Sequence, residues 1–294
     1  MRQIDKQSLS VTVPGCGFNL IEFGARTFEM GFPERAFRAA PVHEVTLDAF
    51  LLGDRCVSAG DFARFLADTP GAVDHMMIDC VDPGFFVHRA AGFVLRPGCA
   101  DFPMIQISFW AAAAYCNWLS DAEGARRVYD VAARTVDYTA DGFRLPTEAE
   151  WEAACRVGWG AAPAVDPDLH NSLDAGSRMA AMRAGVSLAG NFSSAEPTPV
   201  PVTAPVPDAA GLHHMLGNVR EWCQDRFGPY RSDPVSNPHG PAEGSFRVVR
   251  GGSYGEALAT MSAVSRLAAF EGTRCEVYGF RVARSAGNLV TVAG

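Results

Sequence analysis

A run of prolines places the firmest limit on how this chain can fold. Five of them fall between residues 197 and 207, namely Pro197, Pro199, Pro201, Pro205 and Pro207. Proline fixes φ and has no backbone N–H donor, so this run forms neither a helix nor a central strand. It lies in an Ala-, Pro- and Val-rich stretch over residues 160–210. That stretch is either a linker between two domains or a long surface loop on one domain, and we favour the loop.

Three segments elsewhere begin with a residue that caps helices. Ser58 is followed three residues later by Asp61, and Thr147 is followed by Glu150, which is the spacing of a capping box. Ser108 opens another segment, in which apolar residues recur at helical spacing. The sequence therefore predicts helices that begin at these three positions.

Short apolar or alternating segments predict strands. The clearest covers residues 41–47, and others cover 18–31, 246–254 and 277–283. Residues 70–104 are rich in Gly, Pro and Asp and predict a long loop. We therefore expect an α+β fold with short strands, about three helices, little regular secondary structure and long loops. Loops of this length are uncommon in a compact domain and are usually functional.

Composition and charge exclude several classes of protein. The 294 residues allow two ordinary domains or one large domain. The 25 basic and 33 acidic residues give a net charge of −8, which argues against a nucleic-acid partner because phosphate binding needs a basic face. The polar N-terminus predicts no signal peptide, and no stretch approaches the roughly 18 to 20 apolar residues that span a bilayer. We expect a cytoplasmic protein with no membrane partner.

Seven segments occur in an order that points to one family. Residues 142–152 read GFRLPTEAEWE, residues 211–222 read GLHHMLGNVREW, residues 250–254 read RGGSY and residues 279–283 read GFRVA. Three earlier segments, at 28–31, 41–43 and 107–110, also match. Together they resemble the formylglycine-generating-enzyme, or sulfatase-modifying factor, superfamily. The resemblance implies a single large domain over residues 18–285 with an elaborated C-type-lectin-like fold, an N-terminal extension over 1–17 and a tail over 286–294.

The superfamily includes several chemistries, so function has to be argued from the site. Formylglycine-generating enzymes oxidise a substrate cysteine with oxygen and a copper ion held by two cysteines. Ergothioneine-type sulfoxide synthases use iron, relatives of the pyoverdine-maturation protein oxidise a chromophore precursor, and other members bind ligands without catalysis. The two copper positions correspond here to Glu256 and Met261. Copper(I) prefers soft sulfur ligands, so this chain is not expected to be a copper formylglycine-generating enzyme.

The family's calcium site is also altered. The resemblance places its ligands at His214, the carbonyls of Gly217 and Val219, and Glu221. Calcium prefers oxygen ligands, and His214 offers nitrogen. In one interpretation His214 and Glu221, with or without His213, bind iron or another divalent metal, or calcium persists at a modified structural site. In the other, which we favour, a hydrogen-bonded or positively charged imidazole takes the place of the cation beside Glu221.

Residues around the RGGSY segment are the candidates for chemistry. Ser253, Tyr254 and Glu256 are the candidate catalytic residues, with Glu256 as a general base, and Arg220 and Arg266 are the candidate substrate-binding residues. Arg220 replaces an aromatic residue of the family motif and favours an anionic or carboxylate-bearing ligand. Alternatively, Arg220 pairs with Glu221 or Glu256 and has only a structural role.

These observations leave three functions open. The first is an atypical oxidative tailoring enzyme, metal-dependent in one form of the hypothesis, acting on a small metabolite or peptide. The alternative is a non-catalytic lectin-like ligand-binding protein or a partner subunit. The third is a non-redox enzyme or one half of a complex that performs a tailoring step. The remaining polar residues of the family motifs are expected to hold the loops through buried arginine pairs and caps, and they are Arg144, Glu150, Trp151, Arg250 and Arg281.

Overall fold

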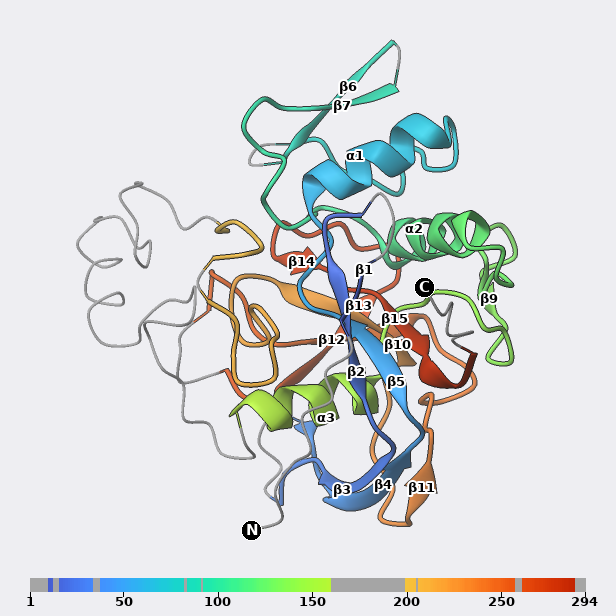
Figure 1. The fold of residues 1–294 in the computed structure, drawn as a ribbon, viewed down its shortest axis with the longest axis vertical. Coiled ribbons are helices and arrows are strands. Elements are labelled where there is room, and N and C mark those ends of the chain that lie inside the picture. The colour runs from blue at the N-terminus through green and yellow to red at the C-terminus, as the bar shows by residue number, and fades with distance from the viewer. Residues whose placement is uncertain are drawn as a thin grey trace, which may run out of the picture.

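Two four-stranded sheets form the centre of the part of the chain that the structure, a computed structural model, describes (Figure 1). The described residues are 10–12, 16–33, 38–81, 84–90, 92–159, 199–204, 206–256 and 261–288. The first sheet has the strand order β1-β2-β5-β15, and the second has the order β13-β12-β10-β14. Their bounds are β1 Ser10–Thr12, β2 Asn19–Phe23, β5 Phe50–Gly53, β15 Ala283–Ser285, β13 Arg266–Phe270, β12 Phe246–Arg250, β10 Arg220–Arg226 and β14 Tyr278–Gly279.

Smaller sheets lie at both ends of this centre (Figure 1). At one end, β11, β4 and β3 form a three-stranded sheet. At the other, the hairpin β6–β7 lies beside α1. The short pair β8–β9 follows α2. The bounds are β3 Arg26–Met30, β4 His43–Leu47, β11 Val235–Ser236, β6 Phe86–Arg89, β7 Gly92–Leu95, β8 Tyr129–Asp130 and β9 Thr135–Val136.

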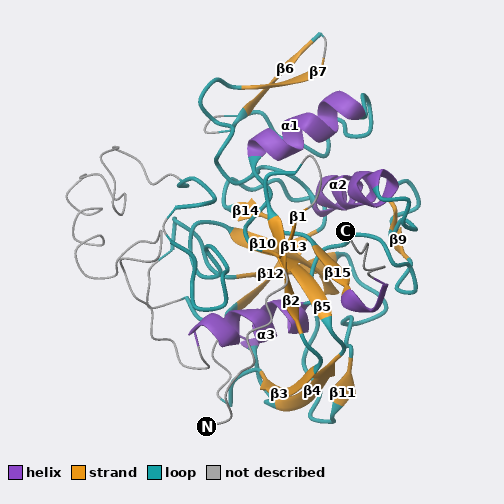
Figure 2. Ribbon diagram, in the orientation of Figure 1, coloured by secondary structure: helices purple, strands orange, loops and turns teal. Residues whose placement is uncertain are grey.

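The three predicted helices begin where their caps place them. They are α1 Ala59–Asp68, α2 Phe109–Ala122 and α3 Glu148–Trp159. The Ser58 side chain accepts from the Asp61 amide, and the Asp61 carboxylate accepts from the Ser58 amide. Thr147 and Glu150 form the same reciprocal pair at the start of α3. A 3-10 turn, η4, covers Ala286–Asn288. Loops connect most of these elements, as Figure 2 shows.

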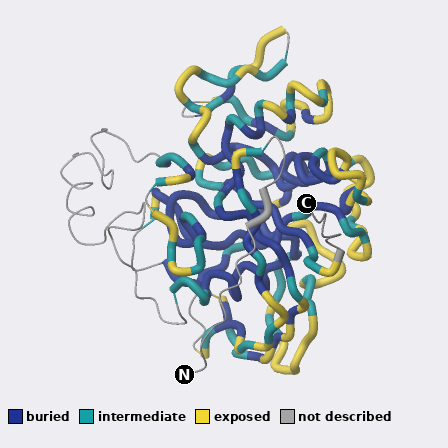
Figure 3. Tube along the Cα trace, viewed as in Figure 1, coloured by how far each residue is buried: buried dark blue, intermediate teal, exposed yellow. Residues whose placement is uncertain are grey.

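The hydrophobic core has two main parts. One surrounds α2, whose residues from Phe109 to Cys116 are all buried, and includes Phe62, Trp222 and Phe280. The other lies between α3 and the strands β4, β5 and β12, with Trp151 at its centre. Figure 3 shows that the buried segments gather around the two four-stranded sheets, while exposed segments lie at the periphery. A helix that is apolar all round has to be enclosed in this way.

Buried arginine pairs hold the family motifs together, as the sequence predicted. Arg144 donates to both carboxylate oxygens of Glu150 at 2.6 Å. Arg250, fully buried, pairs with Glu152, which is also fully buried. Arg281 donates to both oxygens of Glu221 at 2.6 Å, and neither side chain has any exposed surface. Because these buried charges are paired and hydrogen-bonded, the cost of removing them from water is compensated. They can therefore fix loops that have no regular backbone hydrogen bonding.

Several local expectations need correction. The motif segment over residues 211–222 runs directly into strand β10, where Cys223 is buried. Residues 70–104, expected as a loop, contain the hairpin β6–β7. Residues 10–12, expected in an extension, pair with β2 and so join the first sheet. Most of the 160–210 stretch lies outside the described residues. Among the described helices, none combines the length and the apolar character needed to traverse a bilayer.

Candidate functional site

A tight double-glycine turn brings the candidate catalytic residues together. Strand β12 ends at Arg250, and Gly251 and Gly252 follow with φ angles of +99° and +81°. A Cβ atom on Gly252 would lie 2.6 Å from the Cγ atom of Met261, so a side chain does not fit there. Glycine alone adopts this backbone readily. The turn places Ser253, which is buried, and Glu256 beside the first residue of β10.

That first residue is Arg220, and its guanidinium binds Glu256 in a bidentate pair. The Nε and Nη2 atoms of Arg220 donate to the two carboxylate oxygens of Glu256 at 2.6 and 2.5 Å. The Ser253 hydroxyl donates to the same carboxylate at 3.0 Å. The Arg220 side chain is 3% exposed, whereas that of Glu256 is 26% exposed. Glu256 therefore covers Arg220 and is the member of the group that solvent or a ligand reaches first.

One donor of this group has no partner. The Nη1 atom of Arg220 is buried and makes no hydrogen bond within the described residues. A buried guanidinium N–H without an acceptor costs free energy, because it has lost its hydration and gained nothing in exchange. A carboxylate or another anionic acceptor would satisfy it, since the fork of donors on arginine matches such groups.

Two tyrosines lie next to this group. Tyr254 is buried and donates its hydroxyl to the carbonyl of Glu276 at 3.3 Å. Tyr278 lies opposite Arg220 in the pairing of β14 with β10. Burial raises the pKa of both phenols, so each stays neutral and able to donate a hydrogen bond. Tyr278 was not among the residues predicted from the sequence, although it lies directly before the GFR segment.

The predicted metal ligands do not form a ligand set. Glu221 accepts two hydrogen bonds from Arg281, one from the Trp151 indole at 2.8 Å and one from the Cys56 thiol at 3.3 Å. The His214 ring instead faces the carbonyl of Pro201, with 3.3 Å between Nε2 and that oxygen. With its lone pairs occupied, the Glu221 carboxylate does not fit a calcium or iron site.

The neighbouring residues agree with this conclusion. Burial lowers the pKa of His214 to about 3, so the imidazole is neutral and does not replace a cation by its charge. The Gly217 amide donates to the Gly251 carbonyl, and the Val219 side chain packs in a small apolar cluster. Neither contact involves the backbone carbonyl that was predicted as a metal ligand. No three side chains of His, Cys, Asp or Glu come close enough to hold a metal ion within the described ranges. Glu256 and Met261 also lack the thiolates that copper(I) needs, so the residues present do not fit that ion.

Arg266 lies away from the Glu256 group, which corrects the expectation that it binds the same substrate. Its Nε and Nη2 atoms donate to the two carboxylate oxygens of Glu148 at 2.6 and 2.7 Å. Its guanidinium also lies 4.1 Å from the ring centroid of Tyr230. The register that pairs Arg266 with Arg250 directs it towards the first turn of α3, where Glu148 begins the helix. This contact could not be read from spacing in the sequence.

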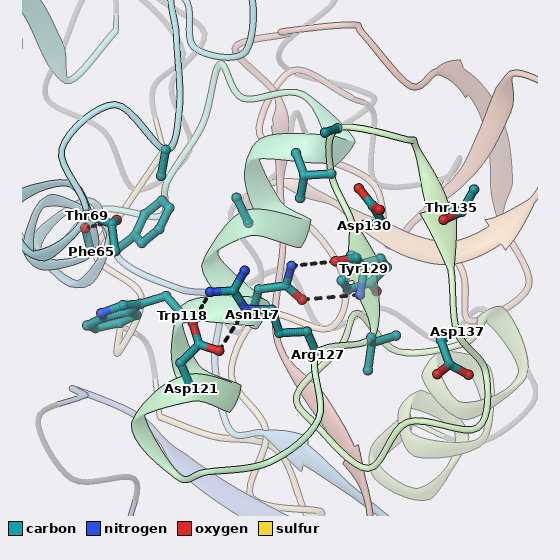
Figure 4. A pocket seen from close by; sticks show the side chains of 15 residues that line it. Phe65, Thr69, Asn117, Trp118, Asp121, Arg127, Tyr129, Asp130, Thr135 and Asp137 are labelled. Carbon is teal, nitrogen blue, oxygen red and sulfur yellow. Dashed lines mark hydrogen bonds and ion pairs between the residues drawn. The ribbon is translucent and has the colours of Figure 1, made fainter.

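A hollow of about 610 Å³ lies between α1, α2 and the β8–β9 pair (Figure 4). Its polar side chains bind each other or the backbone: Asn117 exchanges two hydrogen bonds with Tyr129, and Arg127 binds Asp121 in a bidentate pair. Since these groups are already paired, the hollow is a weaker candidate than the Arg220 and Glu256 group.

Comparisons with known proteins agree with the motifs. The profile of a family described as the sulfatase-modifying factor enzyme 1-like domain matches residues 10–286. The serine/threonine-protein kinase pkn1 of Chlamydia pneumoniae is 29% identical over 90% of this chain and 37% of that protein, so the chain spans little more than a third of the kinase. The formylglycine-generating enzyme of Streptomyces coelicolor is 29% identical over 83% of this chain and 78% of that enzyme. The hercynine oxygenase of Mycolicibacterium smegmatis is 26% identical over 83% of this chain and 54% of that protein.

Solved structures show the same fold. The structure of PvdO from Pseudomonas aeruginosa superposes with a TM-score of 0.67, at 21% identity, over 95% of this chain and 98% of that chain. At this identity the likeness concerns the fold alone. It confirms the prediction of one mixed domain with short strands, few helices and a C-type-lectin-like architecture.

Proposed function

Because the chain belongs to the sulfatase-modifying factor enzyme 1-like family, we propose that it is a tailoring enzyme acting on a small metabolite or peptide that carries an anionic group. The observation behind this proposal is the buried Nη1 donor of Arg220, which has no acceptor within the described part of the chain. A substrate carboxylate would satisfy this donor while lying next to Glu256, Ser253 and Tyr278. The neutral phenol of Tyr278 would add a second donor for the same group.

The chemistry supplied by these residues is proton transfer and orientation. Glu256 is the partly exposed acid of the group and acts as the general base that takes a proton from the bound substrate. Ser253 and Arg220 hold its carboxylate in one geometry. The enzymes among the relatives include a hercynine oxygenase and formylglycine-generating enzymes, which favours an oxygen-dependent reaction for this chain. No step is assigned to copper, because Glu256 and Met261 do not fit it.

Oxygen uptake and product mass test this proposal. The purified protein is incubated in air with a small-molecule extract of its source cells, with an oxygen electrode and mass spectrometry as readouts. We expect one carboxylate-bearing compound to be consumed and its mass to change. Glu256→Gln and Arg220→Met should each slow this conversion by about 100-fold or more, since general acid–base groups contribute about 10²- to 10⁴-fold.

The exposed Glu243 provides the control, because Glu243→Gln removes a carboxylate outside the group. The conversion rate of the Glu243→Gln variant should stay within about twofold of the rate of the unmodified protein. Melting curves must show that each variant is folded, since Glu256→Gln leaves Arg220 with a weaker partner. A rate in Glu256→Gln equal to that of the unmodified protein, or no conversion by the unmodified protein, would contradict the proposal.

One observation favours a second candidate function, a non-catalytic ligand-binding protein. Both oxygens of Glu256 already accept hydrogen bonds, two from Arg220 and one from Ser253, which leaves few lone pairs for a substrate proton. In that case Arg220→Met would abolish retention of a carboxylate-bearing compound in equilibrium dialysis, and no compound in the extract would change its mass.

A further inference from the structure

A separate cavity of about 800 Å³ lies beneath the loop that carries β11. Its walls come from the ends of β3 and β10, from the starts of β4, α3 and β13, and from residues 228–241. None of the residues of the Arg220 and Glu256 group lines it. A volume of this size suits a small organic ligand, for which cavities of about 300 to 1,000 Å³ are usual.

Most of the cavity wall is apolar. Met30, Tyr230, Val235, Pro229 and Pro238 contribute to it. Tyr230 is held in place, because its hydroxyl donates to Glu148 at 3.0 Å and its ring lies against His43 and under the Arg266 guanidinium. The wall is thus built of rigid proline and aromatic surfaces, which bind the hydrocarbon part of a ligand at little cost in conformational entropy.

The loop is fixed against the end of β10 by a glycine. Gly240 has a φ angle of +71°, and a Cβ atom there would lie 2.5 Å from the carbonyl oxygen of Arg226 and 3.1 Å from the Cβ of Asp225. The pairing of β10 with β12 shifts register between Trp222 and Arg226, as at a β-bulge. Bulges re-aim side chains and are frequent next to functional sites. Here the irregular strand end places Asp225 in the cavity wall.

Asp225 is the acid of this cavity that lacks an opposite charge. Glu148 pairs with Arg266 at 2.6 Å, and Asp233 pairs with Arg231 at 3.4 Å. Asp225 is only 3% exposed, accepts the amide of Glu148 at 2.8 Å and takes part in no ion pair within the described residues. Its sequence neighbour Arg226 donates instead to the carbonyls of Ala242 and Gly244.

Burial of an unpaired carboxylate is costly, and the protonation of Asp225 reflects this. Burial and the nearby Glu148 carboxylate raise the pKa of Asp225 to about 8. Glu150 acts in the same direction from α3, while Arg266 opposes it from β13. Arg266 is already paired with Glu148 through two hydrogen bonds, and Arg226, which also lines the cavity, donates to backbone carbonyls and not to Asp225. Neither arginine therefore serves as the ion-pair partner of Asp225.

We propose that this cavity binds a small organic amine, with its ammonium group paired to the carboxylate of Asp225 and its hydrocarbon body against Tyr230, Met30 and Val235. The ammonium supplies the charge that Asp225 lacks and offers N–H donors to its carboxylate oxygens. The ion pair requires ionised Asp225, so binding at pH 7 releases a proton from Asp225 to the solvent. A neutral alcohol of the same shape offers no charge and releases no proton.

Calorimetry with simple probes tests this inference. The probes are butylamine, cyclohexylamine and 2-phenylethylamine, each compared with the corresponding alcohol on the full chain at pH 7. We expect at least one amine to bind more than tenfold tighter than its alcohol. Titrations in two buffers of different ionisation enthalpy should show net proton release. Asp225→Asn, which keeps an oxygen to accept the Glu148 amide, should weaken amine binding by at least tenfold and abolish the proton release.

Asp233→Asn is the matched control, because Asp233 lines the same cavity but is exposed and already paired with Arg231. It should change the affinity less than twofold. Glu256→Gln should leave amine binding unchanged, which separates this inference from the proposed function. The inference is overturned if no amine in the series binds, if the alcohols bind as tightly as the amines, or if Asp225→Asn binds them unchanged.

Discussion

Replacing Arg281 with Met should lower the free energy of unfolding by about 3 to 5 kcal/mol, the range for breaking a buried ion pair by removing one partner. The change leaves Glu221, which has no exposed surface, without its opposite charge. It also removes the donors that Arg281 offers to the carbonyls of Gly53 and His213, each at 2.9 Å. Urea denaturation monitored by tryptophan fluorescence measures the loss.

Arg127→Met provides the matched control for this measurement. Arg127 also makes a bidentate pair, with Asp121, but the two side chains are 62% and 45% exposed. Exposed pairs contribute about 0 to 1 kcal/mol, so this variant should unfold almost like the unmodified protein. The double variant Glu221→Gln with Arg281→Met should recover part of the loss, because it removes the unpaired buried charge.

Metal removal provides a second test of the pairing between Glu221 and Arg281. If Glu221 is a partner of Arg281 rather than a metal ligand, a chelator such as EDTA should leave the urea midpoint unchanged. A midpoint that falls on chelation and is restored by calcium would show that a bound metal stabilises the fold. A cost of Arg281→Met below about 1 kcal/mol would contradict the stabilising role of the buried pair.

Asp225 should make the protein less stable as the pH rises. Its folded pKa, about 8, lies above the value near 3.9 of an unfolded aspartate, so between these two pH values the folded state holds a proton that the unfolded state has lost. The contribution of Asp225 is complete below about pH 4 and is lost as the pH rises through 8. The slope from this group reaches at most about 1.4 kcal/mol per pH unit.

The measurement compares the free energy of unfolding of the unmodified protein and Asp225→Asn from pH 5 to pH 9. The variant cannot titrate at this position, so the difference between the two proteins isolates Asp225 from all other groups. We expect the unmodified protein to lose stability relative to the variant across this range. For Asp233→Asn, which removes an exposed carboxylate, the free energy of unfolding should change with pH in the same way as for the unmodified protein. Parallel curves for Asp225→Asn would refute the buried, unpaired state of this acid.

Local chemistry explains why much of the fold could be predicted from the sequence. Ser58, Ser108 and Thr147 bind amides within three residues of themselves, so their caps are visible in the sequence alone. The ordered motifs predicted that Arg144, Arg250 and Arg281 form buried pairs, but not that Glu152 and Glu221 are the partners of the last two. The pairing of Arg220 with Glu256 was among the alternatives, since both lie at motif positions.

The remaining features depend on contacts between distant segments. Strand β10, which begins inside the GLHHMLGNVREW segment, exists because it lies between β12 and β14. Arg266 was assigned to the wrong neighbours because its partner Glu148 is 118 positions away. No sequence pattern around Asp225 indicated a functional residue. Its burial and its lack of an ion-pair partner depend on residues that are distant along the chain. Propensity and periodicity describe neighbours along the chain, whereas these sites are made by tertiary packing.

The first sheet has a consequence for how the chain folds. It joins β1, β2 and β5 to β15, so that Phe50 lies opposite Ser285. β4 pairs in a similar way with β11, where Val45 lies opposite Val235. These contacts bring together residues about two hundred positions apart, and closing such loops costs entropy before any contact is gained. On the ribosome, β5 can pair with β2 early, but its other edge lacks β15 until nearly the whole domain has been synthesised, so the first sheet is completed only after β15 emerges.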